Sequence, residues 1–127
     1  MTQDKPLRIV VVGAGIVGAF AAITLSKLPN VELSIYEKSP GQREAGAALT
    51  FTESSLRTLS RVIDIDAVQE ILWRPPNGTG LTTRHWKTGE HLTKKEVSSI
   101  EPNFRPAKSQ RIDIHKHLLS LVPVKVN

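Results

Sequence analysis

The hydrophobic residues near the start of the chain change their spacing twice. Residues 7–12 form an almost unbroken apolar run that ends at Gly13, which predicts a β-strand buried on both faces. From Ile16 onward, small and apolar residues have the spacing of a helix packed closely on a sheet, and Pro29 ends it. Residues 31–36 alternate between apolar and polar and predict a second strand. This order predicts a βαβ unit with parallel strands.

The middle of the chain alternates between turn-forming and periodic stretches. Residues 38–46 are polar with proline and glycine and predict a loop. Thr52 is placed to cap a helix with leucines on one side, and residues 66–72 predict another short helical turn. After a break rich in proline and glycine, residues 81–86 and those after Glu90 predict two short strands joined as a hairpin.

The last segment predicts a loop, a helix and the beginning of a strand. Residues 101–109 contain two prolines and are expected to form a loop. Asp113 is expected to cap a helix whose apolar residues fall at positions i, i+4 and i+7. Pro123 ends this helix, and the valine-rich residues 124–126 begin another strand.

The composition fits one globular domain over residues 1–127. The chain is 39% hydrophobic and 23% charged, which is close to the norm for folded proteins and lacks the charge excess of disorder. The net charge is +5, but the basic residues are scattered along the chain, so we expect no nucleic-acid partner.

Two further features narrow the class of protein. The chain contains no cysteine, which excludes disulfides, cysteine-bound metals and a thiol nucleophile. Residues 9–26 carry no charge, but three glycines within them disfavour a signal sequence or a membrane span. We therefore expect a protein of the cytoplasm. A metal site is not expected, because His115 and His117 are two residues apart and lie on different sides of a helix.

The chemistry of the chain concentrates in a glycine motif between the first strand and the first helix. Gly13, Gly15 and Gly18 match the pattern G-x-G-x-x-G in the place where a dinucleotide-binding fingerprint requires it. Gly13 would make a tight turn, Gly15 would let the backbone approach a diphosphate, and Gly18 would let the helix pack closely on the strand. The phosphates would lie at the positive end of the helix.

Glu37 supplies the fourth part of the fingerprint. It follows the second strand, 19 positions after Gly18, where an acid binds the hydroxyl groups of a ribose. A carboxylate there disfavours a 2′-phosphate, so FAD or NAD is preferred over NADP as the bound nucleotide. The residues themselves leave the choice between these two open.

The sequence also resembles a known family over almost its whole length. It is similar to the FAD-dependent monooxygenases of the salicylate hydroxylase and para-hydroxybenzoate hydroxylase group, especially fungal members of secondary metabolism. The motifs that carry the resemblance are the glycine fingerprint with Glu37, residues 43–49 (REAGAAL), residues 56–59 (LRTL) and residues 111–115 (RIDIH) followed by a leucine pair.

The resemblance implies roles for individual residues. Glu37 would bind the adenosine ribose, and Arg111 would contact FAD through charge-assisted hydrogen bonds. Ala48 would lie beside the flavin, at a position that is usually glycine in the group. Arg43 would reach the cofactor's phosphates or ribityl chain. No catalytic residue is assigned.

The resemblance also implies the fold and the activity. We expect a Rossmann-like FAD-binding α/β fold that is the amino-terminal part of the family's domain and stops before its substrate-binding sheet. The complete family hydroxylates or epoxidises small organic substrates with NAD(P)H and oxygen. Because the chain resembles only the first part of the family's sequence, it is expected to be incomplete as an enzyme. Two alternatives stay open: a stand-alone NAD-binding module, and a non-catalytic domain that pairs with a separate chain.

Overall fold

The computed structural model describes residues 5–39, 47–75, 82–94 and 97–127. The chain divides into two compact units, Met1–Ala47 with Gln110–Asn127, and Ala48–Ser109. That residues 1–127 form one domain remains a prediction from the sequence.

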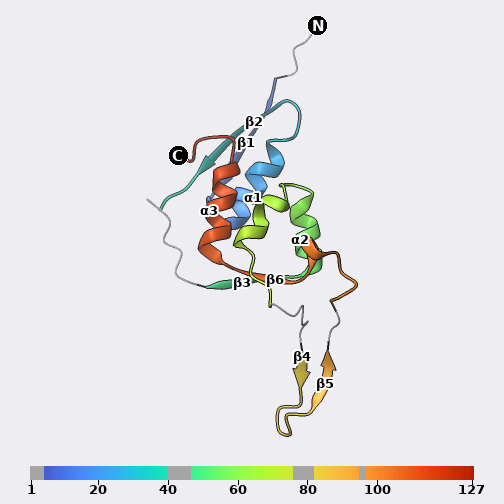
Figure 1. Cartoon of the computed structure of the whole chain (residues 1–127). Coiled ribbons are helices and arrows are strands. Elements are labelled where there is room, and N and C mark those ends of the chain that lie inside the picture. Colours follow the sequence, from blue (N-terminus) through green and yellow to red (C-terminus); the bar gives the residue numbers. More distant parts are fainter. Residues whose placement is uncertain (1–4, 40–46, 76–81, 95–96) are drawn as a thin grey trace. The chain divides into compact units, whose positions relative to one another are not determined.

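The first unit begins with the expected strand, helix and strand (Figure 1). These are β1 (Leu7–Val12), α1 (Ile16–Leu25) and β2 (Val31–Tyr36). The two strands are parallel, with Leu7 opposite Val31 and Val12 opposite Tyr36. The βαβ unit predicted from the hydrophobic spacing is therefore confirmed, and the chain has an α/β start.

The last helix of the chain completes the core of this unit. Helix α3 (Arg111–Leu121) packs against α1. Beyond it, Val126 forms a parallel bridge with Ile35 of β2, where the valine-rich end was predicted to begin a strand. Ile35 is fully buried in a cluster with Ala14 and Ala22, which the partly buried Val126 contacts. The chain end is thereby joined to the same sheet as the glycine motif.

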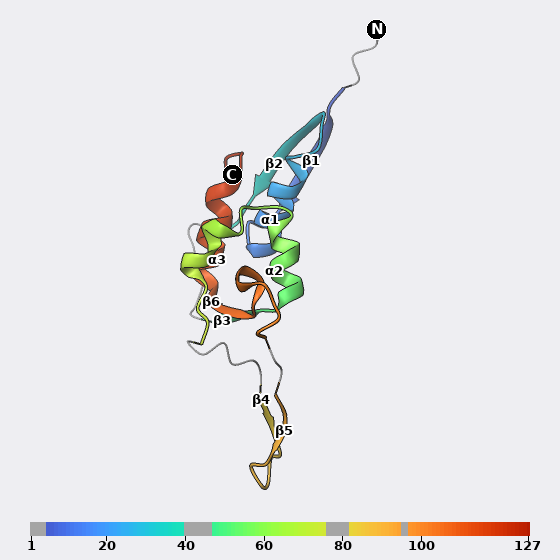
Figure 2. The same ribbon diagram turned by 45° about the vertical axis from the view of Figure 1, so that its right-hand side comes forward.

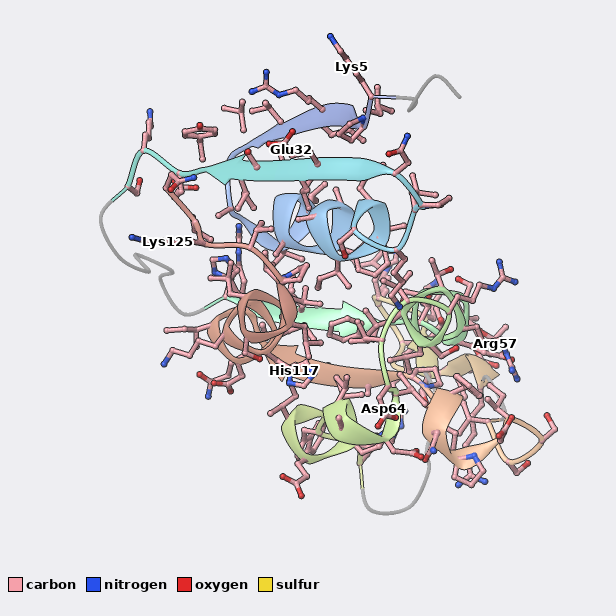
Figure 3. The ribbon with its side chains drawn as sticks, turned by 90° about the horizontal axis from the view of Figure 1, so that it is seen from above. Lys5, Glu32, Arg57, Asp64, His117 and Lys125 are labelled. Carbon is pink, nitrogen blue, oxygen red and sulfur yellow. The ribbon has the colours of Figure 1, made fainter. Side chains whose placement is uncertain are left out.

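Strand β1 is covered on one face only, which corrects the prediction of burial on both faces. Val11 contacts the core cluster, whereas Val10 is 59% and Val12 is 85% exposed. Figure 3 shows α1 on one side of the two strands. On the other side Arg8 pairs with Glu32 across the strands at 3.6 Å. Successive residues of a strand face opposite ways, so a single covering layer buries only every second residue.

The described residues of the second unit form short strands, an α-helix and 3₁₀ turns. Leu56 and Val68, both fully buried, lie in its core. The hairpin of β4 and β5 is antiparallel, as predicted (Figure 2). The elements are β3 (Ala48–Phe51), α2 (Glu53–Ser60), η1 (Asp66–Ile71), β4 (Thr82–Arg84), β5 (His91–Lys94), η2 (Pro102–Phe104) and β6 (Ala107–Gln110).

Two local predictions are corrected by these elements. Residues 101–109 are not only loop, because they contain η2 and enter β6, which pairs with β3. Ala107 and Ser109 of β6 are buried while Lys108 is exposed, and this two-residue alternation is too short to stand out beside two prolines. Gln110 occupies the N-cap position of α3 without a side-chain capping bond, and Asp113 lies in the first turn, where its charge still favours the helix dipole.

Thr52 caps α2 as the sequence predicts. Its backbone is extended, and its Oγ1 accepts a hydrogen bond from the N–H of Ser55 at 3.3 Å. Replacing Thr52 with alanine removes that acceptor, and we expect the free energy of unfolding to fall by about 1 kcal/mol. Urea denaturation, monitored by circular dichroism, measures the change. Thr52→Ser keeps the acceptor and is the control, and equal stability of the two variants would contradict the capping bond.

Candidate functional site

The turn between β1 and α1 starts at a glycine with a left-handed backbone. Gly13 has φ of +97°, a conformation that glycine adopts without the steric cost of a Cβ. Its N–H donates to the carbonyl of Tyr36 at 2.6 Å. The chain therefore turns away from β1 at Gly13 while it is still bonded to the end of β2.

Gly18 lets the first turn of α1 approach this bend. A Cβ built on Gly18 would lie 1.8 Å from the carbonyl oxygen of Gly13 and 3.5 Å from a methyl group of Val11. No side chain fits at the first of these distances, since the neighbour is backbone and cannot rotate away. Helix and strand are thus in contact through a position that only glycine can occupy.

Gly15 differs from the other two, because the chain itself does not require a glycine there. It is the N-cap of α1 with φ of −66° and ψ of −179°, an extended backbone that any residue adopts. A Cβ at Gly15 would meet nothing within 4 Å. No side chain caps this helix end, and Val17 beside it is 82% exposed. The first N–H groups of a helix have no partner within the helix, so this open end is suited to an anion.

Glu37 lies directly beside the glycine turn. Its Oε2 accepts from the N–H of Ala14 at 2.8 Å, and its Oε1 accepts from the N–H of Ser39 at 2.8 Å. These N–H groups, with that of Ser39 contributing most, hold the pKa of the Glu37 carboxyl below its ordinary value of 4.5. The carboxylate keeps lone pairs for further donors, because each of its oxygens accepts about two bonds.

A histidine reaches the same turn from the other direction. The Nε2 of His115, a buried residue of α3, lies 2.6 Å from the carbonyl oxygen of Ala14. Sequence reasoning considered His115 only as a metal ligand and missed this contact. The available signal was its spacing, because His115 comes four residues after Arg111 and therefore lies one helical turn along the same side of α3.

The other residues predicted to contact the cofactor do not all lie at the glycine turn. Arg111 is the first residue of α3 and is exposed, and its backbone N–H donates to the carbonyl of Ala47 at 2.9 Å. Ala48 opens β3 in the second unit and is also exposed. Arg43 lies outside the residues that the structure describes. The structure thus brings together the glycine turn, Glu37 and the helix that carries Arg111.

The groups around the glycine turn are suited to binding an anion. An uncapped helix start offers N–H donors, a bare glycine leaves space in front of them, and an ionised carboxylate stands beside the turn. Together these groups suit an anion joined to a sugar hydroxyl pair. Among the described residues no cluster of three or more histidines and acids could hold a metal ion. None of the helices described has the length and apolar character needed to cross a bilayer.

Comparisons with known proteins identify relatives of the chain. No family model matches the chain. It is 32% identical over 119 residues to the 3-amino-4-hydroxybenzoate 2-monooxygenase PtnB3 of Streptomyces platensis, a match that covers 91% of the chain and 29% of that protein. It is 45% identical over 49 residues to the FAD-dependent monooxygenase str9 of Strobilurus tenacellus, which covers 39% of the chain and 11% of that protein.

The fold is also similar to that of solved structures. A salicylate hydroxylase solved as a substrate complex matches 98% of the chain and 28% of its own length, with a TM-score of 0.73 and 19% sequence identity. The chain spans about three tenths of the length of the relatives that it matches over most of its residues. It is a homologue of FAD-dependent monooxygenases of the salicylate hydroxylase type, matched over a fragment of their length.

Proposed function

We propose that the chain is the FAD-binding segment of a flavoprotein monooxygenase with a Rossmann-like cofactor site. The observation that carries the proposal is the environment of Gly15, a glycine with an ordinary backbone and open space around its missing Cβ, at an uncapped helix start. A glycine in such a place serves a close approach from outside the chain. A diphosphate is the group that such a helix end favours.

The neighbouring side chains support a dinucleotide over a free phosphate. The carboxylate of Glu37 is bonded to Ala14, one residue before Gly15, so a ribose attached to the diphosphate would come within its reach. Arg111 lies one helical turn from His115, whose ring touches the same turn, and it would add a cationic contact. Ala48 beside the flavin and Arg43 near its phosphates or ribityl chain remain proposals from the family resemblance.

FAD is proposed over NAD because relatives of the chain are named as FAD-dependent monooxygenases. The bound flavin would supply the transfer of electrons from NAD(P)H and the activation of oxygen for hydroxylation or epoxidation of an organic substrate. The residues of this chain would bind and orient it: the turn for the diphosphate, Glu37 for the ribose and Arg111 for charge. No residue of the chain is proposed as catalytic.

The test is to measure which nucleotide the 127-residue chain binds. We expect FAD, added to the purified chain, to lose part of its fluorescence and to remain with the protein through a desalting column, with its visible absorbance. NAD and NADP, titrated separately by calorimetry, are expected to bind more weakly. Preferential binding of NAD would replace the proposal with a stand-alone NAD module. Absence of any dinucleotide binding would contradict both.

A further inference from the structure

Ala14 is held from two sides by side chains that are distant in the sequence. Its N–H donates to Glu37, the residue after β2, at 2.8 Å, and its carbonyl oxygen lies 2.6 Å from Nε2 of His115. Ala14 itself is buried, with 4% of its surface exposed. The peptide groups before and after Ala14 therefore each have one external partner, at the centre of the glycine turn.

The His115 contact fixes the direction of one particular N–H group. A backbone carbonyl only accepts hydrogen bonds, so Nε2 of His115 is the donor and carries a proton. The carbonyl of Ala14 and the N–H of Gly15 belong to one planar trans peptide and point in opposite directions. Holding the carbonyl toward α3 therefore points the N–H of Gly15 away from that helix.

The imidazole that does this is itself rigidly placed. His115 is 6% exposed, and its neighbours Ile114 and Leu118 are each 1% exposed, so this face of α3 is fixed by packing. Helix α3 in turn packs against α1, whose first residue follows Gly15. The bond thus joins the start of α1 to the packed face of α3, a helix that lies about a hundred residues further along the chain.

We infer that His115 is a positioning residue of the cofactor site, which orients the Ala14–Gly15 peptide so that the Gly15 N–H faces the diphosphate. The inference rests on the proposed FAD binding, but the orientation of the peptide does not. His115 touches neither the cofactor nor a reacting atom in this account. It acts through the backbone, because its bond to the Ala14 carbonyl holds the Gly15 N–H in position before the nucleotide binds.

The experiment compares three variants of the 127-residue chain by NMR and by FAD titration. His115→Leu removes the donor, and His115→Gln restores an N–H near the position of Nε2. His117→Leu is the matched control, a second histidine of α3 (Figure 3) whose Nε2 has no hydrogen-bond partner in the described structure. All variants are first checked for native circular dichroism.

In the unmodified chain, long-range ¹H–¹⁵N spectra are expected to show a proton on Nε2 of His115. His115→Leu should shift the Gly15 amide resonance, speed its hydrogen exchange and weaken FAD binding by about tenfold. His115→Gln should return the Gly15 amide toward its original shift and keep FAD binding within about threefold. His117→Leu should change neither.

The outcomes separate the two proposals. A neutral ring protonated on Nδ1, or an unchanged Gly15 amide in His115→Leu, would overturn the inference even if FAD binds well. The Gly15 amide resonance could shift in His115→Leu and recover in His115→Gln while the chain binds no dinucleotide. That result would support the positioning role of His115 and contradict the proposed function. Equal loss of FAD binding in the Leu and Gln variants would show that the residue acts only as packing.

Discussion

Replacing Gly18 with alanine is expected to unfold the start of α1. The added methyl group would lie 1.8 Å from the carbonyl oxygen of Gly13, and no rotation of a side chain relieves a contact with backbone. The helix must move away from the end of β1, which opens the packing around Ala14 and Ala22. We expect a loss of roughly 3 kcal/mol in the free energy of unfolding, the upper end for overpacking, measured by urea denaturation.

Gly15→Ala is the matched comparison, since it adds the same methyl group three residues away. Nothing within 4 Å opposes a Cβ there, and φ of −66° suits alanine. Alanine is a poorer N-cap than glycine, but it also restricts the unfolded chain, so stability should change by no more than about 0.5 kcal/mol. FAD binding should nevertheless weaken by about tenfold or more, because the methyl group occupies the space of a close approach.

These two variants test whether Gly18 is required for packing and Gly15 for ligand binding. Gly18→Ala should lose structure, and Gly15→Ala should lose only the ligand. A Gly15→Ala chain that binds FAD as tightly as the original would show that the diphosphate does not lie against this turn. A Gly18→Ala chain of normal stability would contradict the contact between Gly18 and Gly13.

The second large effect is expected from Glu37→Gln. The carboxylate accepts from two backbone N–H groups, those of Ala14 and Ser39, with one oxygen each. Glutamine has one acceptor oxygen, so its NH₂ group would face one of these donors. Losing a charge-assisted bond to the turn, and the proposed contact with a ribose, should weaken FAD binding by roughly ten- to a hundredfold. Fluorescence titration of FAD measures the change.

The stability of the turn should also depend on pH through the same carboxyl. Its pKa is lower in the folded chain than its ordinary value of 4.5, because Ser39 and Ala14 stabilise the ionised form. The folded state therefore gains stability from Glu37 above pH 4.5, and this gain is lost as the pH falls through the lowered pKa. Unfolding midpoints of the original chain and Glu37→Gln should differ most above pH 4.5 and converge in more acidic solution.

Glu32→Gln is the control for Glu37, since Glu32 lies on β2, the strand that Glu37 directly follows. Glu32 forms an exposed pair with Arg8 at 3.6 Å, and such pairs contribute little. FAD affinity should be unchanged in this variant. If Glu32→Gln reduced FAD binding as much as Glu37→Gln, the effect would come from net charge and not from the turn.

The sequence was most informative where the structural demand is local. A left-handed Gly13, a glycine at position 18 against the strand end and Thr52 at a helix start are each specified by a few neighbouring residues. The strand and helix periods are local for the same reason, and they predicted the parallel pair of β1 and β2. Glu37 was placed by its position at the end of β2, which follows from the βαβ geometry.

What the sequence left undetermined depends on segments that meet only in the folded chain. The pairing of β3 with β6 joins residues 48–51 and 107–110, and neither short stretch has a strong pattern of its own. Burial of one face of β1 was overestimated, because an apolar run does not reveal how many layers will cover it. Asp113 was mistaken for a cap, because Gln110 continues from β6 directly into α3.

By itself, the sequence determined the turn: three glycines at fixed spacing and an acid after the next strand specify a bend that can face a diphosphate, because backbone sterics act between near neighbours. The tertiary structure alone decided what holds that bend in place. The bond from His115 to Ala14 crosses 101 positions of the chain and exists only because α3 packs on α1. The spacing of Arg111 and His115 places both on one side of α3, but the partner of His115 depends on the direction in which two helices meet.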